Sequence, residues 1–255
     1  MPKHLFLYLL VALVIGFTVW SLQTTEIDLE KIRQGFFVKP FFGEFLQGLW
    51  PPNWGILGEV SWQMLVTIQM AWIGTVLATA ISLPLSFVAA RNITPAVAVG
   101  ALTRFFFNVD RSVDVLIVAL ILVSAVGLGP LAGVLALAAH SVGSMGKLFA
   151  EAIETIDRGP IEALESTGAS RLQVIRWGVV PQVMPLLVSN FFYRLELNIR
   201  SSVILGIVGA GGIGFMLYDN IKQFQYQNVS MILLVIIGVV MSIDYVSGKL
   251  RKATV

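Results

Sequence analysis

Four polar residues recur at about every fourth position of one apolar stretch, and their types suit the binding of an anion. They are Asn190, Arg194, Asn198 and Ser201, and this spacing places them on one face of a helix. Ionisable residues inside a membrane span are costly, so they usually face a bundle interior or a water path. Guanidinium groups match phosphate-like oxygens well. The stripe therefore predicts either an anion path or, with equal weight, a structural ion pair that includes Arg194.

A glycine-rich segment follows the stripe and matches the pattern G-x-G-x-x-G over residues 209–214. A dinucleotide-dependent enzyme is the rival class, but its fingerprint needs a strand before the glycines and an acidic residue about 20 positions later. After Asp219, the next acid is Asp244, which lies inside an apolar run. We therefore interpret the glycines as a kink or gate at the outer face of a membrane, formed by Gly206, Gly209, Gly211, Gly212 and Gly214.

A charged stretch at residues 150–181 stands between hydrophobic runs and holds five of the 15 acidic residues. Pro160 suits the first turn of a helix, and Gly168 suits the left-handed residue that ends one. Ser170 can then cap a second helix. The stretch predicts two short helices outside the bilayer. Ile161 and Leu164, three residues apart, would form an apolar knob that a partner protein could bind.

The same stretch resembles the EAA loop of bacterial ABC-importer permeases, which reads EAA, three residues, Gly, nine residues and then I-x-L-P. Here Glu162 opens the motif, and Gly168 and Pro181 follow in register, but Gly178 replaces the isoleucine and Val180 the leucine. The resemblance implies a helix that docks in a groove of an ATP-hydrolysing subunit. It assigns this role to Pro160, Ile161, Glu162, Ala163, Leu164, Gly168, Ala169, Ser170 and Arg171.

The composition around these motifs is that of an integral membrane protein. Of 255 residues, 56% are hydrophobic and 13% charged, against about 25% charged in soluble domains. Cysteine is absent, and the two histidines, His4 and His140, lie far apart, so we expect no metal site, cofactor or catalytic group. The net charge of +2 is too small to predict a nucleic-acid partner.

The apolar runs predict an all-α membrane protein with about six transmembrane helices. A proline and three glycines near residues 127–133 split one long run in two, and the short apolar segment 95–110 is expected to lie along the cytoplasmic surface. The predicted spans are residues 5–22, 61–88, 112–127, 131–149, 180–200 and 228–247.

Charge sets the expected orientation of these spans. Eleven of the 17 Lys and Arg residues fall in segments that the six-span arrangement places inside, and five fall outside, namely Lys31, Arg33, Lys39, Arg200 and Lys222. The excess inside predicts cytoplasmic termini and a cytoplasmic 150–181 loop. Together with the resemblance to bacterial importer permeases, it implies a multi-pass protein of the bacterial cytoplasmic (inner) membrane.

From about residue 60 onward the chain is similar to permeases of phosphonate importers. The similarity rests on PLSFVAARN at 84–92, GLGPLAG at 127–133, GKLFAEAIE at 146–154, TGASR at 167–171 and VGAGGIG at 208–214. It implies a type I ABC-importer fold like that of the methionine importer. Its implied partners are a second copy of the chain, two cytoplasmic ATP-binding subunits, a periplasmic or lipid-anchored substrate-binding protein and membrane lipid.

The apolar run at 5–22 and the start of the similarity at about residue 60 divide the chain in two, and the resemblance implies the cargo. Residues 1–60 would form a transmembrane helix plus a periplasmic interfacial segment, and residues 61–255 the permease core. The cargo would be phosphonate, phosphite or hypophosphite, moved by alternating access, with ATP hydrolysed by the partner subunit. A permease of the same type for another small solute, such as an amino acid, stays open as an alternative.

Overall fold

The computed structural model describes residues 3–25, 30, 33–34, 40–94 and 96–254, and every regular element in these ranges is a helix. The chain forms two compact units, Met1–Trp50 and Pro51–Val255. The first contains α1 (Lys3–Thr24) and α3 (Pro40–Gly48). Side chains from Leu5 to Trp20 are apolar and mostly exposed, which is typical of a helix that meets lipid. Much of the predicted interfacial segment, at 26–29, 31–32 and 35–39, lies outside the described residues.

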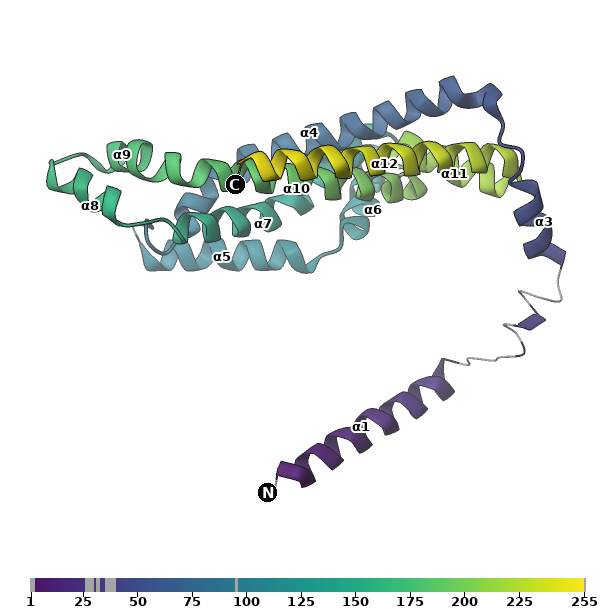
Figure 1. The fold of residues 1–255 in the computed structure, drawn as a ribbon, viewed down its shortest axis with the longest axis horizontal. Coiled ribbons are helices and arrows are strands. Elements are labelled where there is room, and N and C mark those ends of the chain that lie inside the picture. Colours follow the sequence, from purple (N-terminus) through teal and green to yellow (C-terminus); the bar gives the residue numbers. More distant parts are fainter. Residues whose placement is uncertain (1–2, 26–29, 31–32, 35–39, 95, 255) are drawn as a thin grey trace. The chain divides into compact units, whose positions relative to one another are not determined.

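The second unit is a bundle of long helices with a small projection at one end (Figure 1). Its helices are η2 (Trp54–Ile56), α4 (Leu57–Ala89), α5 (Val97–Ser112), α6 (Val115–Val126), α7 (Pro130–Glu154), α8 (Gly159–Ser166), α9 (Arg171–Val174), η3 (Ile175–Val179), α10 (Val180–Leu205), η4 (Gly206–Ala210), α11 (Gly212–Lys222) and α12 (Tyr226–Thr254). Both η3 and η4 are π-helical. The projection consists of α8 and α9, which follow α7 and precede α10.

Among the residues that the structure describes, five helical segments are long and apolar enough to cross a membrane, namely Leu5–Thr24, Trp54–Ala89, Pro130–Glu154, Arg171–Ala210 and Tyr226–Arg251. The predicted span at 112–127 is wrong as a separate crossing. Its helix, α6, has 12 residues and would reach about 18 Å, whereas the hydrocarbon core of a bilayer is about 30 Å thick. The predicted break is confirmed, since Gly127 and Gly129 have φ of 99° and 136° and Pro130 starts α7.

The expectation that 95–110 lies on the membrane surface is also wrong, because α5 packs lengthwise against the bundle. Phe107 fills the space left by Gly146 on α7, and Arg104 donates a hydrogen bond to the Ala89 carbonyl oxygen. Farther along, α6 packs beside the first half of α7 in the cluster that holds Ala119 and Ala136. Together α5 and α6, with 16 and 12 residues, supply about 42 Å of helix that runs antiparallel to α7, which is enough for one crossing of a bilayer.

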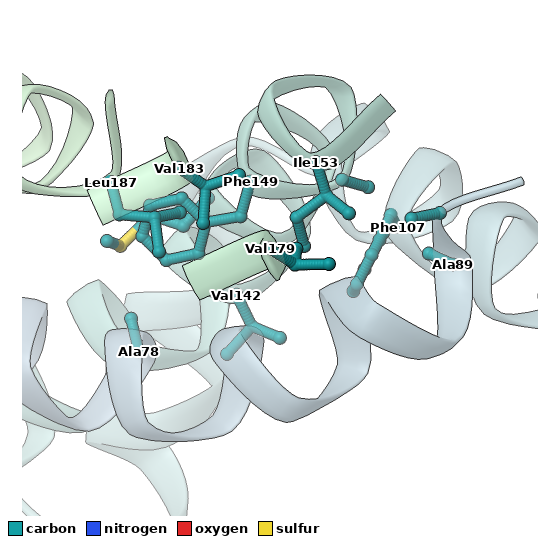
Figure 2. Close-up of a cluster of buried hydrophobic side chains, with 12 residues drawn as sticks. Ala78, Ala89, Phe107, Val142, Phe149, Ile153, Val179, Val183 and Leu187 are labelled. Atoms are coloured by element: carbon teal, nitrogen blue, oxygen red, sulfur yellow. The ribbon is translucent and has the colours of Figure 1, made fainter. Parts of the chain in front are cut away.

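Small residues bring α4 and α7 close together. A side chain at Gly74 would begin 2.9 Å from Leu137 Cβ, and Ser82 Oγ donates to the Val142 carbonyl oxygen at 3.0 Å. Such residues allow helices in lipid to approach closely. At the end of the bundle nearest α8, a buried cluster joins α4, α5, α7 and α10, and Figure 2 shows Phe107, Phe149, Ile153, Val179 and Val183 within it.

Candidate functional site

The 150–181 loop forms the two short helices that its sequence predicts. Pro160 lies in the first turn of α8, and Gly168 has a φ of 76° just after its end. The Gly168 and Ala169 N–H groups donate to the carbonyl oxygens of Glu165 and Leu164, at 3.0 and 3.3 Å, and so close the helix end. Gln173 Oε1 accepts from the Ser170 N–H at 2.7 Å, as in a capping box at the start of α9.

The apolar face of α8 points inward, which corrects the expectation of an apolar knob for a partner. Ile161 and Leu164 are half-buried, and a side chain at Gly178 would begin 3.1 Å from Leu164 Cδ1 and 3.6 Å from Ile161 Cγ1. The glycine that replaces the usual isoleucine therefore leaves room for these two side chains at the base of α10. The outward face of α8 carries Glu162 and Ala163, which are exposed.

The sequence analysis missed two exposed hydrophobic residues beside α8. Leu172 is 79% exposed and Trp177 is 65% exposed. Both lie in the first turns of the apolar segment Arg171–Ala210, where large exposed apolar side chains meet a partner or the membrane, and their position next to the EAA-like motif was the available signal. Arg171 has a different task, because its Nη2 donates to the Ile93 carbonyl oxygen at 3.0 Å and ties α9 to the end of α4.

The structure joins two of the four residues in the polar stripe. Arg194 is 8% exposed, and its Nε donates to Ser141 Oγ at 2.9 Å. Asn198 is 1% exposed, and its Nδ2 donates to Thr75 Oγ1 at 2.9 Å and to Ser141 Oγ at 3.0 Å. This buried network connects α4, α7 and α10. Asn190 and Ser201 lie on the same helix, are half-buried, and are not part of the network.

The ion pairs of α10 do not involve Arg194. Glu196 instead pairs with Arg200 at 3.0 Å and with Arg251 at 3.1 Å, and Arg200 also meets Asp244 at 2.6 Å. These contacts bind α10 to α12. Because α10 continues to Leu205, Arg200 lies inside the helix and not in an outside segment as the charge count supposed. Within the described part of the chain, Arg194 has no carboxylate oxygen within 4.0 Å.

The predicted kink forms at the glycine segment. Gly209, Gly211 and Gly212 have φ values of 93°, 78° and 71°, which side chains rarely adopt. At Gly206 the chain passes so close to α11 that a side chain there would begin 2.5 Å from the Phe215 nitrogen. The same holds for Gly214, where it would overlap the Val203 carbonyl oxygen. The end of α10 and the start of α11 thus form a tight reversal.

Two contacts fasten this reversal to the rest of the bundle. Thr67 Oγ1 accepts from the Ile213 N–H at 2.8 Å, which joins α11 to α4. The Gly129 N–H donates to the Gly209 carbonyl oxygen at 2.9 Å, which joins η4 to the turn between α6 and α7. A helix precedes the G-x-G-x-x-G pattern where a dinucleotide site needs a strand, so the rival enzyme class loses its structural basis.

Comparison with known proteins identifies the family. The model of the binding-protein-dependent transport system inner membrane components matches residues 82–250. The phosphite transport system permease protein PtxC of Stutzerimonas stutzeri is 47% identical over 204 residues, which are 79% of this chain and 74% of that protein. The phosphate-import permease protein PhnE of Mycolicibacterium smegmatis is 42% identical over 207 residues, which are 81% of this chain and 39% of that protein.

The fold has a solved counterpart. A chain in the structure titled "Inward facing conformations of the MetNI methionine ABC transporter" superposes with a TM-score of 0.69 at 20% identity, over 80% of this chain and 99% of that one. The fold is therefore that of a type I ABC-importer permease, and such a permease works with a partner ATPase and a substrate-binding protein. The relatives are named as transport permeases, so this chain is a transport subunit and not an enzyme. The chain belongs to the family of binding-protein-dependent transport system inner membrane components.

Proposed function

We propose that the chain is the permease subunit of an ATP-driven importer for a small phosphorus oxyanion such as phosphonate, phosphite or hypophosphite. The burial of Arg194 is the observation that best supports an anionic cargo. Its guanidinium is buried among helices of a membrane protein and has no carboxylate oxygen within 4.0 Å in the described residues, although Asp110 on α5 attracts it from farther away, and a buried cation without a close counterion is costly. A passing oxyanion would supply that counterion. The names of PtxC and PhnE support phosphorus as its central atom.

The proposed path runs along α10. Asn190, Arg194, Asn198 and Ser201 are its candidate residues. In the present conformation Asn198 is fully buried, so it reaches the cargo only if α10 separates from α7. Ser141 belongs with this set because it accepts from both Arg194 and Asn198. The glycine segment at 206–214 is the proposed periplasmic gate or kink.

The proposed ATPase contact is the outward face of α8 and its flanks. Glu162, Ala163 and the turn at Gly168 are exposed and would enter the groove of the ATP-hydrolysing subunit. Leu172 adds apolar surface next to them. Pro160, Ile161, Leu164, Ala169, Ser170 and Arg171 would hold this face in place, since their contacts are within the chain. ATP binding and hydrolysis would then move the spans between inward-open and outward-open states.

The complete transporter would contain two copies of the chain, two ATPase subunits and one substrate-binding protein. Both termini would be cytoplasmic, and residues 1–60 would add a transmembrane helix and a periplasmic segment to the permease core at 61–255. The bacterial inner membrane is the proposed location.

The test is uptake by cells that produce the chain with its ATPase and binding protein, measured for phosphite, methylphosphonate and methionine. Uptake of either phosphorus compound, abolished when the ATPase cannot hydrolyse ATP, supports the proposal. Methionine is included because the methionine import permease MetP of Bacillus subtilis is 31% identical over 159 residues, or 60% of this chain and 72% of that protein. Methionine uptake alone would replace the proposed cargo with an amino acid.

A further inference from the structure

A cavity of about 290 Å³ lies at the end of the bundle that carries α8, between the end of α4, α5 and α7. It is separate from the polar stripe and from the outward face of α8. Its polar lining consists of Arg91, Arg104, Asn108, Lys147, Glu151 and Glu154. Three cations and two carboxylates thus share a small space, which leaves one positive charge in excess.

The two carboxylates are already engaged. Glu154 Oε1 accepts a hydrogen bond of 2.8 Å from the Arg91 backbone N–H, so it faces the end of α4. Glu151 lies 4.0 Å from Lys147 Nζ. These contacts leave both guanidinium groups without an ion pair in the described structure. Arg104 uses one N–H on the Ala89 carbonyl oxygen and keeps its others for a ligand.

The cavity lies about two turns of α7 beyond the residues that bind Arg194. Arg194 Nη2 donates to the His140 carbonyl oxygen at 3.5 Å, and Lys147 is seven residues farther along the same helix. Seven residues span about 10 Å along the axis of α7.

We propose that this cavity is a second anion site, which binds a phosphorus oxyanion on Arg91, Arg104 and Lys147. Guanidinium groups bind such oxygens through two parallel N–H donors, which suits a phosphoryl group better than a spherical anion. The oxyanion is either the free cargo or the phosphate of a lipid headgroup, and the two share this chemistry. The choice of phosphorus rests on the proposed function, whereas the positive charge of the cavity does not.

The test is protection of Lys147 from acetylation, read by mass spectrometry on the purified complex with its ATPase. The complex is kept in dodecyl maltoside, a detergent without phosphate, and phosphite is the probe. Saturating phosphite should slow acetylation of Lys147 about tenfold, which corresponds to ~1.4 kcal/mol of protection. Lys222 on α11 stacks on Tyr218 far along the chain, and it is the internal control that should not change.

Two variants tie the protection to the cavity. Asn108→Asp adds a negative charge to the lining without removing a cation, and it should abolish protection. Arg91→Gln removes one guanidinium but keeps the backbone bond to Glu154, and it should weaken protection severalfold. Both positions are exposed, so folding is preserved, and unchanged elution of the complex on gel filtration checks this.

The second arm repeats the reaction in phosphatidylglycerol bilayers without phosphite. Protection there, lost in Asn108→Asp, identifies the lipid phosphate as the occupant, whereas protection that requires phosphite identifies the free anion. Equal acetylation of Lys147 under all conditions would overturn the proposal. Phosphite uptake by the same wild-type complex is measured in parallel. Uptake without protection of Lys147 would overturn the cavity site alone, whereas absence of uptake would overturn the proposed cargo.

Discussion

Gly178 at the base of α10 lies directly against Leu164 of α8, with only 3.1 Å between the position of a Cβ at 178 and Leu164 Cδ1. The contact joins the 150–181 loop to the helix that carries Arg194. Any side chain larger than glycine at 178 therefore acts on the position of α8.

The first prediction follows from this contact. Gly178→Ala should have little effect, because Leu164 Cδ1 is the end of a flexible side chain and can move by a few tenths of an ångström. Gly178→Ile restores the residue usual in the motif but overfills the site, at a cost of ~1–3 kcal/mol. Phosphite uptake per assembled complex should then fall several times further than in Gly178→Ala. Equal uptake in the two variants would show that α8 does not depend on this packing.

The second prediction separates backbone strain from docking at Gly168. The φ of Gly168 is 76°, and an alanine placed in this left-handed conformation would lower stability by ~1–2 kcal/mol, whereas Asp adopts it more readily. If the loop enters the ATPase, Gly168→Asp should lower uptake more than Gly168→Ala, because it adds a charge to the docking surface. Glu162→Lys should do the same by reversing an exposed charge. ATPase co-purification and uptake are measured together, and normal uptake in Glu162→Lys would count against docking by α8.

The third prediction concerns Arg194. Arg194→Lys keeps the charge but loses the two parallel N–H donors of the guanidinium, so partial uptake should remain. Arg194→Ala should lower uptake about tenfold or more, and a tenfold loss corresponds to ~1.4 kcal/mol. Uptake is divided by the amount of complex in the membrane. If Arg194→Ala reduces the complex but leaves uptake per complex normal, Arg194 is structural, through its bond to Ser141.

The fourth prediction compares two glycines of the last third of the chain. Gly214→Ala places a Cβ onto the Val203 carbonyl oxygen, so the reversal must open, and the thermal midpoint should fall by several degrees for a cost of ~1–3 kcal/mol. Gly238→Ala is the matched control, since it lies within α12 and no atom stands within 4 Å of the new Cβ. A lower midpoint in Gly238→Ala alone would contradict the tight reversal.

The fifth prediction concerns orientation. A phosphatase reporter fused after Arg158 should be inactive, as expected in the cytoplasm, and one fused after Lys39 should be active in the periplasm. The same activity at both positions would invalidate the six-span arrangement, in which α5 and α6 together make the third crossing, and the cytoplasmic placement of both termini.

Local signals in the sequence predicted where several helices begin or end, although the ends of α7, α10 and α12 lie five to seven residues beyond the predicted spans. Pro130, Pro160 and Gly168 act through their own backbone preferences, which depend little on distant contacts. The tight reversal was predicted for the same reason, because a cluster of glycines permits conformations that other residues avoid.

The errors share one physical cause, which is that contacts with residues far away in sequence decide where a segment packs. Arg104 and Asp110 lowered the hydropathy of α5, but the first donates to Ala89 and the second accepts from the Gly143 N–H at 2.7 Å. These bonds let α5 pack lengthwise in the bundle. The direction of Ile161 and Leu164 was missed similarly, because the space that receives them is made by Gly178, which lies beyond α9.

The two π-helical segments at the ends of α10 have a mechanical consequence. α10 is α-helical over 26 residues but contains Pro185, which has no N–H to donate, whereas η3 and η4 on either side are wound more loosely, and such segments often mark functional sites. Bending is therefore expected at residues 175–179 and 206–210 and near Pro185, and the part of α10 from residue 186 to 205 is expected to move as one rod. If α8 moves on contact with an ATPase, we expect this rod to tilt, so that Arg194 and the glycine reversal at 206–214 move together.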